Sequence, residues 1–201
     1  MCDLLGTPFA YDEGPGALSA AALADPPPWD RARAAVIFDD AAKGLVHALK
    51  YRDSNEAGLF MVRMMIRAGR ELLPDCDVVI PVPLHWTRLW TRRFNQAAFL
   101  AKPLAESAGK TFSANILVRR VATRQQVGLN AKARQNNVRK AFNVPFEKSR
   151  IIAGKTILLV DDVRTTGATF SACAMALKKA GAARVFVLSF ALVNEPHRMH
   201  I

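Results

Sequence analysis

The sequence has few cysteines, few tyrosines and no long apolar run. Its 201 residues include three cysteines, Cys2, Cys76 and Cys173, and two tyrosines. Three thiols cannot build a disulfide framework, so we expect them free in a reducing compartment, with Cys76 and Cys173 as small core residues. No apolar run approaches the roughly 20 residues that a membrane helix needs, and the start does not resemble a signal peptide. We therefore expect a cytoplasmic protein without membrane insertion.

Acidic residues are also scarce, with 17 against 28 lysines and arginines, which leaves a net charge of +11. Such a balance suits an anionic partner, either a polyphosphate or a nucleic acid. The composition, 51% hydrophobic and 22% charged, is that of a globular protein, and the length favours one domain with room for a small appendage.

The strongest pattern is Ile157-Leu-Leu-Val-Asp-Asp-Val-Arg-Thr-Thr-Gly-Ala-Thr169. Four apolar residues predict a strand buried on both faces of a parallel sheet, with Asp161 and Asp162 at its carboxyl end, the edge where such sheets bind ligands. Apolar residues at helical spacing then predict a helix over residues 170–180. The order is strand, acidic pair, hydroxyl-rich loop and helix.

This order fits a ribose 5-phosphate. The loop and the helix amino terminus present N–H and hydroxyl donors to a phosphate. The two carboxylates can accept hydrogen bonds from vicinal sugar hydroxyls. The competing interpretation is a buried strand that ends in two solvated aspartates before an ordinary Thr/Gly turn.

The run from Val160 to Thr169 resembles the signature of type I phosphoribosyltransferases. In that family the acidic pair holds the ribose of phosphoribosyl pyrophosphate (PRPP), and the loop holds its 5-phosphate. The resemblance implies that Asp161 and Asp162 are catalytic and contact Mg²⁺ indirectly. It also implies that PRPP binds to Val163, Arg164, Thr165, Thr166, Gly167, Ala168 and Thr169.

A second block, Asp77-Val-Val-Ile-Pro-Val-Pro-Leu-His-Trp86, predicts another buried strand that enters a proline-restricted loop. With the arginines and Phe-Asn-Gln that follow, it resembles the ComF family, although this chain has Arg93 where the family pattern has glycine. The resemblance implies a pyrophosphate-binding loop that contains Pro83, Leu84, His85, Arg88, Arg92, Asn95 and Gln96. The alternative is a proline-bounded loop with a solvated basic turn.

The polar region 119–139 contains an arginine pair, glutamines and Arg134. Its resemblance to the ComF pattern implies a lid over PRPP, with Arg134 on the lid. A nucleic-acid contact surface or a solvated linker is equally open.

Residues 1–30 are rich in Gly, Pro and Ala and predict a loop-rich appendage. The segment resembles the amino-terminal zinc knuckle of ComF proteins, in which two C-x-x-C pairs would fall near Cys2 with Leu5 and near Ser19 with Ala22. Only Cys2 remains here. Because a structural zinc site needs four ligands, we expect no zinc.

The alternation of strands and helices predicts an α/β fold, with a parallel-sheet type I phosphoribosyltransferase-like core over residues 31–201. The ComF resemblance implies transfer of the phosphoribosyl group from PRPP to an unidentified nitrogen nucleophile, and a link to DNA uptake in natural transformation. The alternatives are a basic adaptor for single-stranded DNA and for competence or recombination proteins, and a salvage enzyme for a purine or pyrimidine base. The acceptor and the oligomeric state, including a homodimer, stay open.

Overall fold

The computed structural model describes residues 1–11, 13–52, 54–84, 94–119 and 141–193. Its central feature is a five-stranded parallel sheet in the order β1-β7-β6-β2-β3. The strands of this sheet are β1 (Arg31–Ile37), β2 (Val78–Pro81), β3 (Thr111–Phe112), β6 (Thr156–Arg164) and β7 (Arg184–Leu192). A separate antiparallel pair is formed by β4 (Val118–Arg119) and β5 (Phe142–Asn143). The helices are α1 (Ala20–Ala24), α2 (Asp40–Tyr51), α3 (Asn55–Ala68), α5 (Gln96–Ser107), α7 (Phe146–Ile152) and α8 (Ala168–Lys179).

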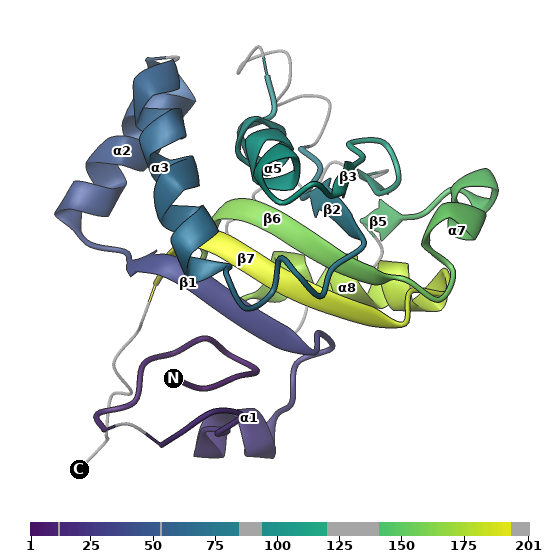
Figure 1. Ribbon diagram of the computed structural model, residues 1–201, viewed down its shortest axis with the longest axis horizontal. Coiled ribbons are helices and arrows are strands. Elements are labelled where there is room, and N and C mark those ends of the chain that lie inside the picture. The colour runs from purple at the N-terminus through teal and green to yellow at the C-terminus, as the bar shows by residue number, and fades with distance from the viewer. Residues whose placement is uncertain (12, 53, 85–93, 120–140, 194–201) are drawn as a thin grey trace, which may run out of the picture.

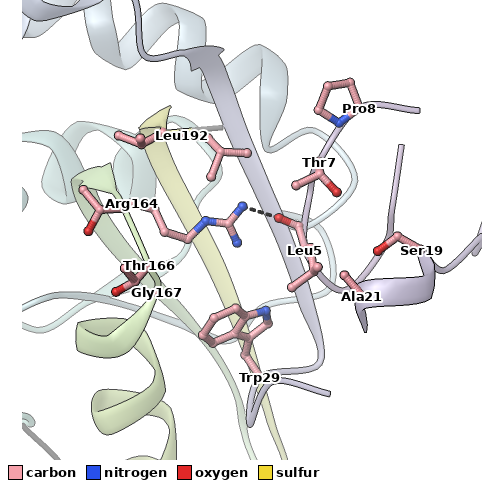
Figure 2. A pocket seen from close by; sticks show the side chains of 12 residues that line it. Leu5, Thr7, Pro8, Ser19, Ala21, Trp29, Arg164, Thr166, Gly167 and Leu192 are labelled. Carbon is pink, nitrogen blue, oxygen red and sulfur yellow. Dashed lines mark hydrogen bonds between the residues drawn. The ribbon is translucent and has the colours of Figure 1, made fainter. Parts of the chain in front are cut away.

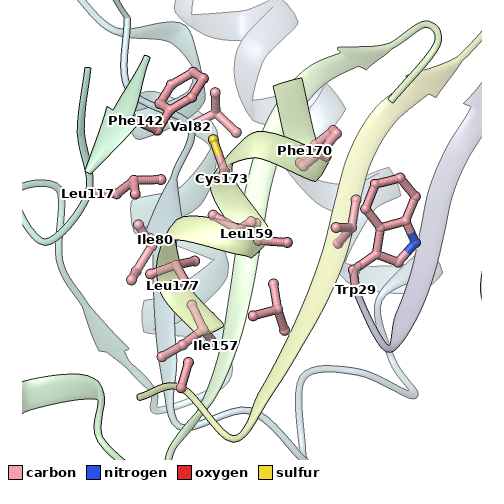
Figure 3. Packing of buried hydrophobic residues seen from close by; sticks show 14 of the residues in the cluster. Trp29, Ile80, Val82, Leu117, Phe142, Ile157, Leu159, Phe170, Cys173 and Leu177 are labelled. Atoms are coloured by element: carbon pink, nitrogen blue, oxygen red, sulfur yellow. The ribbon is translucent and has the colours of Figure 1, made fainter. Parts of the chain in front are cut away.

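Helices cover both faces of the sheet, with α2, α3 and α5 on one face and α8 on the other (Figure 1). The strand β6 lies in the middle and buries alternate side chains on the two faces. Ile157 and Leu159 belong to the cluster that includes α8, whereas Leu158 and Val160 belong to the cluster on the opposite face. Figure 3 shows Ile157 and Leu159 packed beside Leu177 of α8. The predicted α/β fold is confirmed, and burial on two faces is the reason for the continuous apolar run.

The strand β6 extends further than the sequence pattern predicts. It continues past the apolar run to Arg164, because Val163 and Arg164 still pair with Ala191 and Leu192 of β7. The helix α3 ends at Ala68, where the chain turns at Gly69. The helix α5 contains Pro103 and continues through it as one element. Within the described part of the chain, no helix is long and apolar enough to cross a membrane.

The amino-terminal segment, residues 1–30, packs beside β1 at the end of the sheet (Figure 1). The Ala32 N–H donates a hydrogen bond of 3.0 Å to the Asp3 carbonyl oxygen. The Trp29 indole N–H donates one of 2.6 Å to the Leu4 carbonyl oxygen. Gly6 has a φ of +63°, and a Cβ at this position would lie 2.7 Å from the Ala32 carbonyl oxygen. Glycine therefore permits both the left-handed backbone and the close approach to β1.

An ion cluster around Arg33 joins this segment to the sheet. Arg33 is buried, and one of its terminal nitrogens lies 2.6 Å from Asp3 Oδ1 and 2.7 Å from Glu71 Oε2. Arg31 adds a contact of 3.1 Å to Asp3 Oδ2. Two carboxylates from separate parts of the chain thus compensate one buried guanidinium.

This cluster predicts an acid-sensitive stability. Burial raises the pKa of Asp3, but hydrogen bonds and charges from Arg33 and Arg31 outweigh it, so the pKa lies below the ordinary 3.8. The pKa of Glu71 lies below 4.5, chiefly through its hydrogen bond with Arg33. Depressed carboxyl pKa values stabilise the fold above the unfolded-state values, and this stabilisation is lost as the pH falls through the folded-state values. We therefore expect the free energy of unfolding, measured with urea, to decrease below about pH 4.5.

In the variant Asp3→Asn, the free energy of unfolding should decrease less steeply as the pH falls. Glu13→Gln is the matched control, because it removes an exposed carboxylate of the same segment. If the free energy of unfolding decreases equally steeply at low pH in Asp3→Asn and in the unchanged protein, Asp3 is not a source of the acid sensitivity.

Candidate functional site

The acidic pair lies in the last four residues of β6. Asp162 is 7% exposed, and its Oδ2 lies 2.5 Å from Nζ of Lys50 near the end of α2. Asp161 is half-buried, and its Oδ1 accepts a hydrogen bond of 2.9 Å from the Asp162 N–H. Asp162 is therefore paired with a cation, whereas Asp161 accepts a hydrogen bond from a main-chain donor.

This asymmetry changes the ionisation of Asp161. Burial and the neighbouring charge of Asp162 raise its pKa to about 8, against the lowering effects of the Asp162 N–H, Lys50 and Arg119. Compared with an ordinary aspartate, the protonated form of Asp161 is thus favoured in the free protein. A ligand that presents a cation or hydroxyl donors to this carboxylate would favour its ionised form.

Cys173 on α8 is fully buried, and burial and the charge of Asp161 raise the pKa of its thiol well above the usual value. Burial also raises the pKa of Cys76, to about 11. Both cysteines belong to the hydrophobic clusters, which confirms that they are core residues.

A short turn connects β6 to α8. Thr165 and Thr166 are exposed, and Gly167 is buried with a φ of +78° at the amino-terminal cap of α8. Thr166 Oγ1 accepts a hydrogen bond of 3.4 Å from the Ala168 N–H. Ala168 and Thr169 form the first turn of the helix, where main-chain N–H groups have no helical partner. The turn therefore presents hydroxyls and N–H donors from three residues beyond the acidic pair, an arrangement that suits a phosphate.

The side chains of Val163 and Arg164 point into the protein. Val163 packs against the cluster on the side of α2, α3 and α5. Arg164 is buried on the other side, where it lies over Trp29 and donates a hydrogen bond to the Leu5 carbonyl oxygen (Figure 2). Val163 and Arg164 therefore contribute only main-chain atoms to the segment that leads into the turn.

The second predicted loop begins beside this site, because Pro81 at the end of β2 pairs with Val160 of β6. Pro83 and Leu84 follow and are half-buried. Asn95, at the other end of the loop, caps α5 by accepting from the Ala97 N–H at 3.0 Å, and it donates to the Val82 carbonyl oxygen at 3.3 Å.

Gln96, the first residue of α5, is 2% exposed, and its Nε2 is buried without a hydrogen-bond partner among the described residues. Pro81 and Asn95 thus hold the two ends of this loop near β6. The buried amide of Gln96 lies at the second end. His85, Arg88, Arg92 and Arg134 lie outside the described residues.

The site fits Mg²⁺ better than the amino-terminal segment fits zinc. Two adjacent carboxylates are hard oxygen ligands of the kind that Mg²⁺ prefers, and this ion commonly takes its further ligands from substrate phosphates and water. No group of three or more His, Cys, Asp or Glu side chains that could hold a metal occurs within the described ranges.

The knuckle positions do come together. Cys2 Sγ accepts hydrogen bonds from the Ser19 hydroxyl and N–H at 3.4 and 3.3 Å, and from the Leu5 N–H at 3.5 Å. Burial raises the pKa of Cys2, but these hydrogen bonds hold it below the usual value. Of the four knuckle positions, Leu5 and Ala22 have no side-chain group that binds a metal. A single sulfur, that of Cys2, therefore does not fit a structural zinc site. Absence of zinc stays a prediction.

Two residues of this region were missed by the sequence analysis, Lys50 and Trp29. Lys50 lies near the end of α2, and no local pattern in the sequence shows which end of that helix meets β6. Trp29 lies at the boundary between the appendage and β1, where composition alone gave no signal.

Comparison with known proteins assigns the family. A family model described as the phosphoribosyl transferase domain matches residues 99–199. The DNA utilization protein YhgH of Salmonella typhi is 32% identical over 192 residues, which cover 93% of this chain and 82% of that protein. Competence protein F of Haemophilus influenzae is 30% identical over 174 residues, which cover 84% of this chain and 76% of that protein. This chain belongs to the ComF family.

The ComF-family protein therefore has a phosphoribosyltransferase domain, as the signature from Val160 to Thr169 predicted. Among solved structures, the allosteric regulatory enzyme of purine biosynthesis aligns with 66% of this chain and 26% of its own chain, at 22% identity and a TM-score of 0.45. The assignment to the ComF family rests on the sequence matches.

Proposed function

We propose that this protein binds PRPP with Mg²⁺ and transfers its phosphoribosyl group to a nitrogen nucleophile, with release of pyrophosphate. The observation that carries the proposal is the continuous arrangement of the acidic pair, the turn at residues 165–167 and the amino terminus of α8. The carboxylate pair suits the hydroxyls of a ribose, and the turn before α8 suits its 5-phosphate.

In this proposal the ribose hydroxyls donate hydrogen bonds to Asp161 and Asp162. The 5-phosphate accepts hydrogen bonds from Thr165, Thr166 and the first N–H groups of α8. Lys50 compensates the charge of Asp162, so the pair does not carry two uncompensated charges next to an anionic substrate.

The reaction breaks the bond from C1 of the ribose to the pyrophosphate oxygen and forms a bond from C1 to nitrogen. Mg²⁺, when bound, neutralises the charge that develops on the departing pyrophosphate. The chain's own task is to hold the ribose and the leaving group in position while positive charge develops on the sugar. We assign Arg88 and Arg92 to the pyrophosphate and Arg134 to the lid on the resemblance to the family.

Calorimetric titration of PRPP with Mg²⁺ tests this proposal. We expect binding in the micromolar range, and we expect it to disappear in the double variant Asp161→Ala, Asp162→Ala. Because burial and Asp162 favour the protonated form of Asp161, ligand binding should release protons, and the measured heat at neutral pH should change with the ionisation enthalpy of the buffer. The double variant Asp75→Ala, Glu106→Ala is the matched control, because it removes two exposed carboxylates and should bind PRPP normally.

The second candidate is a basic adaptor that acts in DNA utilization and competence, the roles for which the two relatives are named. The net charge of +11 favours it. No heat of PRPP binding from a folded protein, together with DNA affinity that falls steeply with salt and is unchanged by Asp161→Ala, would replace the enzyme by the adaptor. For either role we place the protein in the cytoplasm, since Cys2, Cys76 and Cys173 are all free thiols.

A further inference from the structure

A cavity of about 400 Å³ lies between the amino-terminal segment and the turn that follows β6. Figure 2 shows it bounded by Leu5 and Pro8 on one side, Leu192 on another, and Trp29 below. Hydroxyl groups of the amino-terminal segment and of the turn also line it. The walls are thus mainly apolar, with a few polar groups, as in sites for small molecules.

The cavity contains a buried cation that pairs with no carboxylate of the described residues. Arg164 is 4% exposed, and its guanidinium lies 5.9 Å from the centre of a Trp29 ring. Its terminal Nη2 donates to the Leu5 carbonyl oxygen, whereas Nε is buried and has no hydrogen-bond partner in the part of the chain that the structure describes. No carboxylate of the described residues forms an ion pair with it, and burial lowers its pKa to about 10 against the raising effect of the nearby Cys2 sulfur.

This arrangement is costly in the free protein. A buried charge normally has a counter-ion, and a buried donor normally has an acceptor. The unused Nε–H and the terminal N–H groups lie on one edge of the guanidinium, and such an edge can donate two hydrogen bonds to a carboxylate. A single negative charge would neutralise the site, and a flat ring would fit against the indole and the apolar walls.

We propose that the cavity binds a small aromatic carboxylate, with its ring against Trp29 and its carboxylate on Arg164. The site is distinct from the acidic pair of the proposed function. Asp162 pairs with Lys50 on the side of α2, whereas Arg164 lies over Trp29 in the cluster on the opposite face of the sheet. The two sites have the turn at residues 165–167 in common, since these residues also line the cavity and Gly167 lies against Trp29.

Fluorine NMR of the full chain labelled with 5-fluorotryptophan tests the proposal, with benzoate as the probe. The Trp29 resonance is assigned from the variant Trp29→Phe. We expect benzoate to shift this resonance in a saturable way, and neutral benzamide to bind at least about tenfold more weakly, because it lacks the charge that Arg164 requires.

Two variants separate the charge from the cavity. Arg164→Gln should weaken benzoate at least about tenfold, while its amide can still donate to the Leu5 carbonyl oxygen. Arg184→Gln, which removes an arginine at the amino end of β7, is the matched control and should leave binding unchanged. Ala21→Leu reduces the cavity without removing a charge, and it should weaken benzoate while the melting temperature stays near that of the unchanged protein.

Equal benzoate affinity in Arg164→Gln and in the unchanged protein would overturn the proposal. So would a Trp29 shift caused by ribose 5-phosphate and not by benzoate, because Arg164 would then serve the phosphate turn. Either result leaves the calorimetric test of PRPP binding intact, since that test depends on Asp161 and Asp162.

Discussion

Replacing Asp161 by asparagine is expected to make the protein more stable and to abolish PRPP binding. The pKa of Asp161 is raised from 3.8 to about 8 in the folded state. A raised carboxyl pKa gives stability that is fully present below 3.8 and is lost as the pH rises towards 8. Asparagine carries no charge, and its Oδ1 can still accept the Asp162 N–H. Since one pKa unit corresponds to about 1.4 kcal/mol, we expect a gain of at least this size at about pH 8.

The measurement is urea denaturation at about pH 5 and pH 8, since the gain should grow with pH between them. Asp162→Asn is the comparison, because it removes the partner of Lys50 and should destabilise the fold. A loss of stability in Asp161→Asn at the higher pH would show that ionised Asp161 is well accommodated. The expected pattern, a site residue that costs stability and is kept for binding, is the usual trade-off between stability and function.

Replacing Gly6 by alanine is expected to cause a large loss of stability for a single added methyl group. Its φ of +63° costs an L-residue about 1–2 kcal/mol. The new Cβ would also lie 2.7 Å from the Ala32 carbonyl oxygen, a main-chain atom of β1 that cannot rotate away. We expect a total loss of about 3 kcal/mol or more in the free energy of unfolding.

Gly109→Ala is a close control, because Gly109 has a φ of +62° and nothing within 4 Å of its added Cβ. It should show only the cost of the backbone conformation. The difference between the two variants measures the contact of the amino-terminal segment with β1. If both lose the same free energy, the segment does not hold Gly6 against β1 in solution.

The sequence predicted the sheet and the acidic pair because both depend on local patterns. The run Ile157 to Val160 is apolar because both faces of β6 are covered, and the glycine of the turn is required by a φ of +78°. The helix α7 was not predicted, since it has seven residues and Pro145 at its cap forms no side-chain hydrogen bond.

Contacts between distant segments could not be predicted. Arg164 was grouped with the phosphate-binding residues by its position in the signature, but β6 extends to this residue and directs its side chain to Trp29. The pairing of Lys50 with Asp162 depends on how α2 packs against the sheet, which no spacing in the sequence encodes.

The position of the amino-terminal segment also affects how much of the edge strand β1 is open to pairing with another molecule. β1 is the outermost strand on its side of the sheet, and such a strand offers unpaired main-chain groups as a template for a strand of another molecule. Asp3 and Gly6 occupy part of this exposed side, and Arg31 and Arg33 place charges along it. The segment thus covers main-chain groups of β1 with which a strand of another molecule could otherwise pair, and it does so through packing and hydrogen bonds that require no metal.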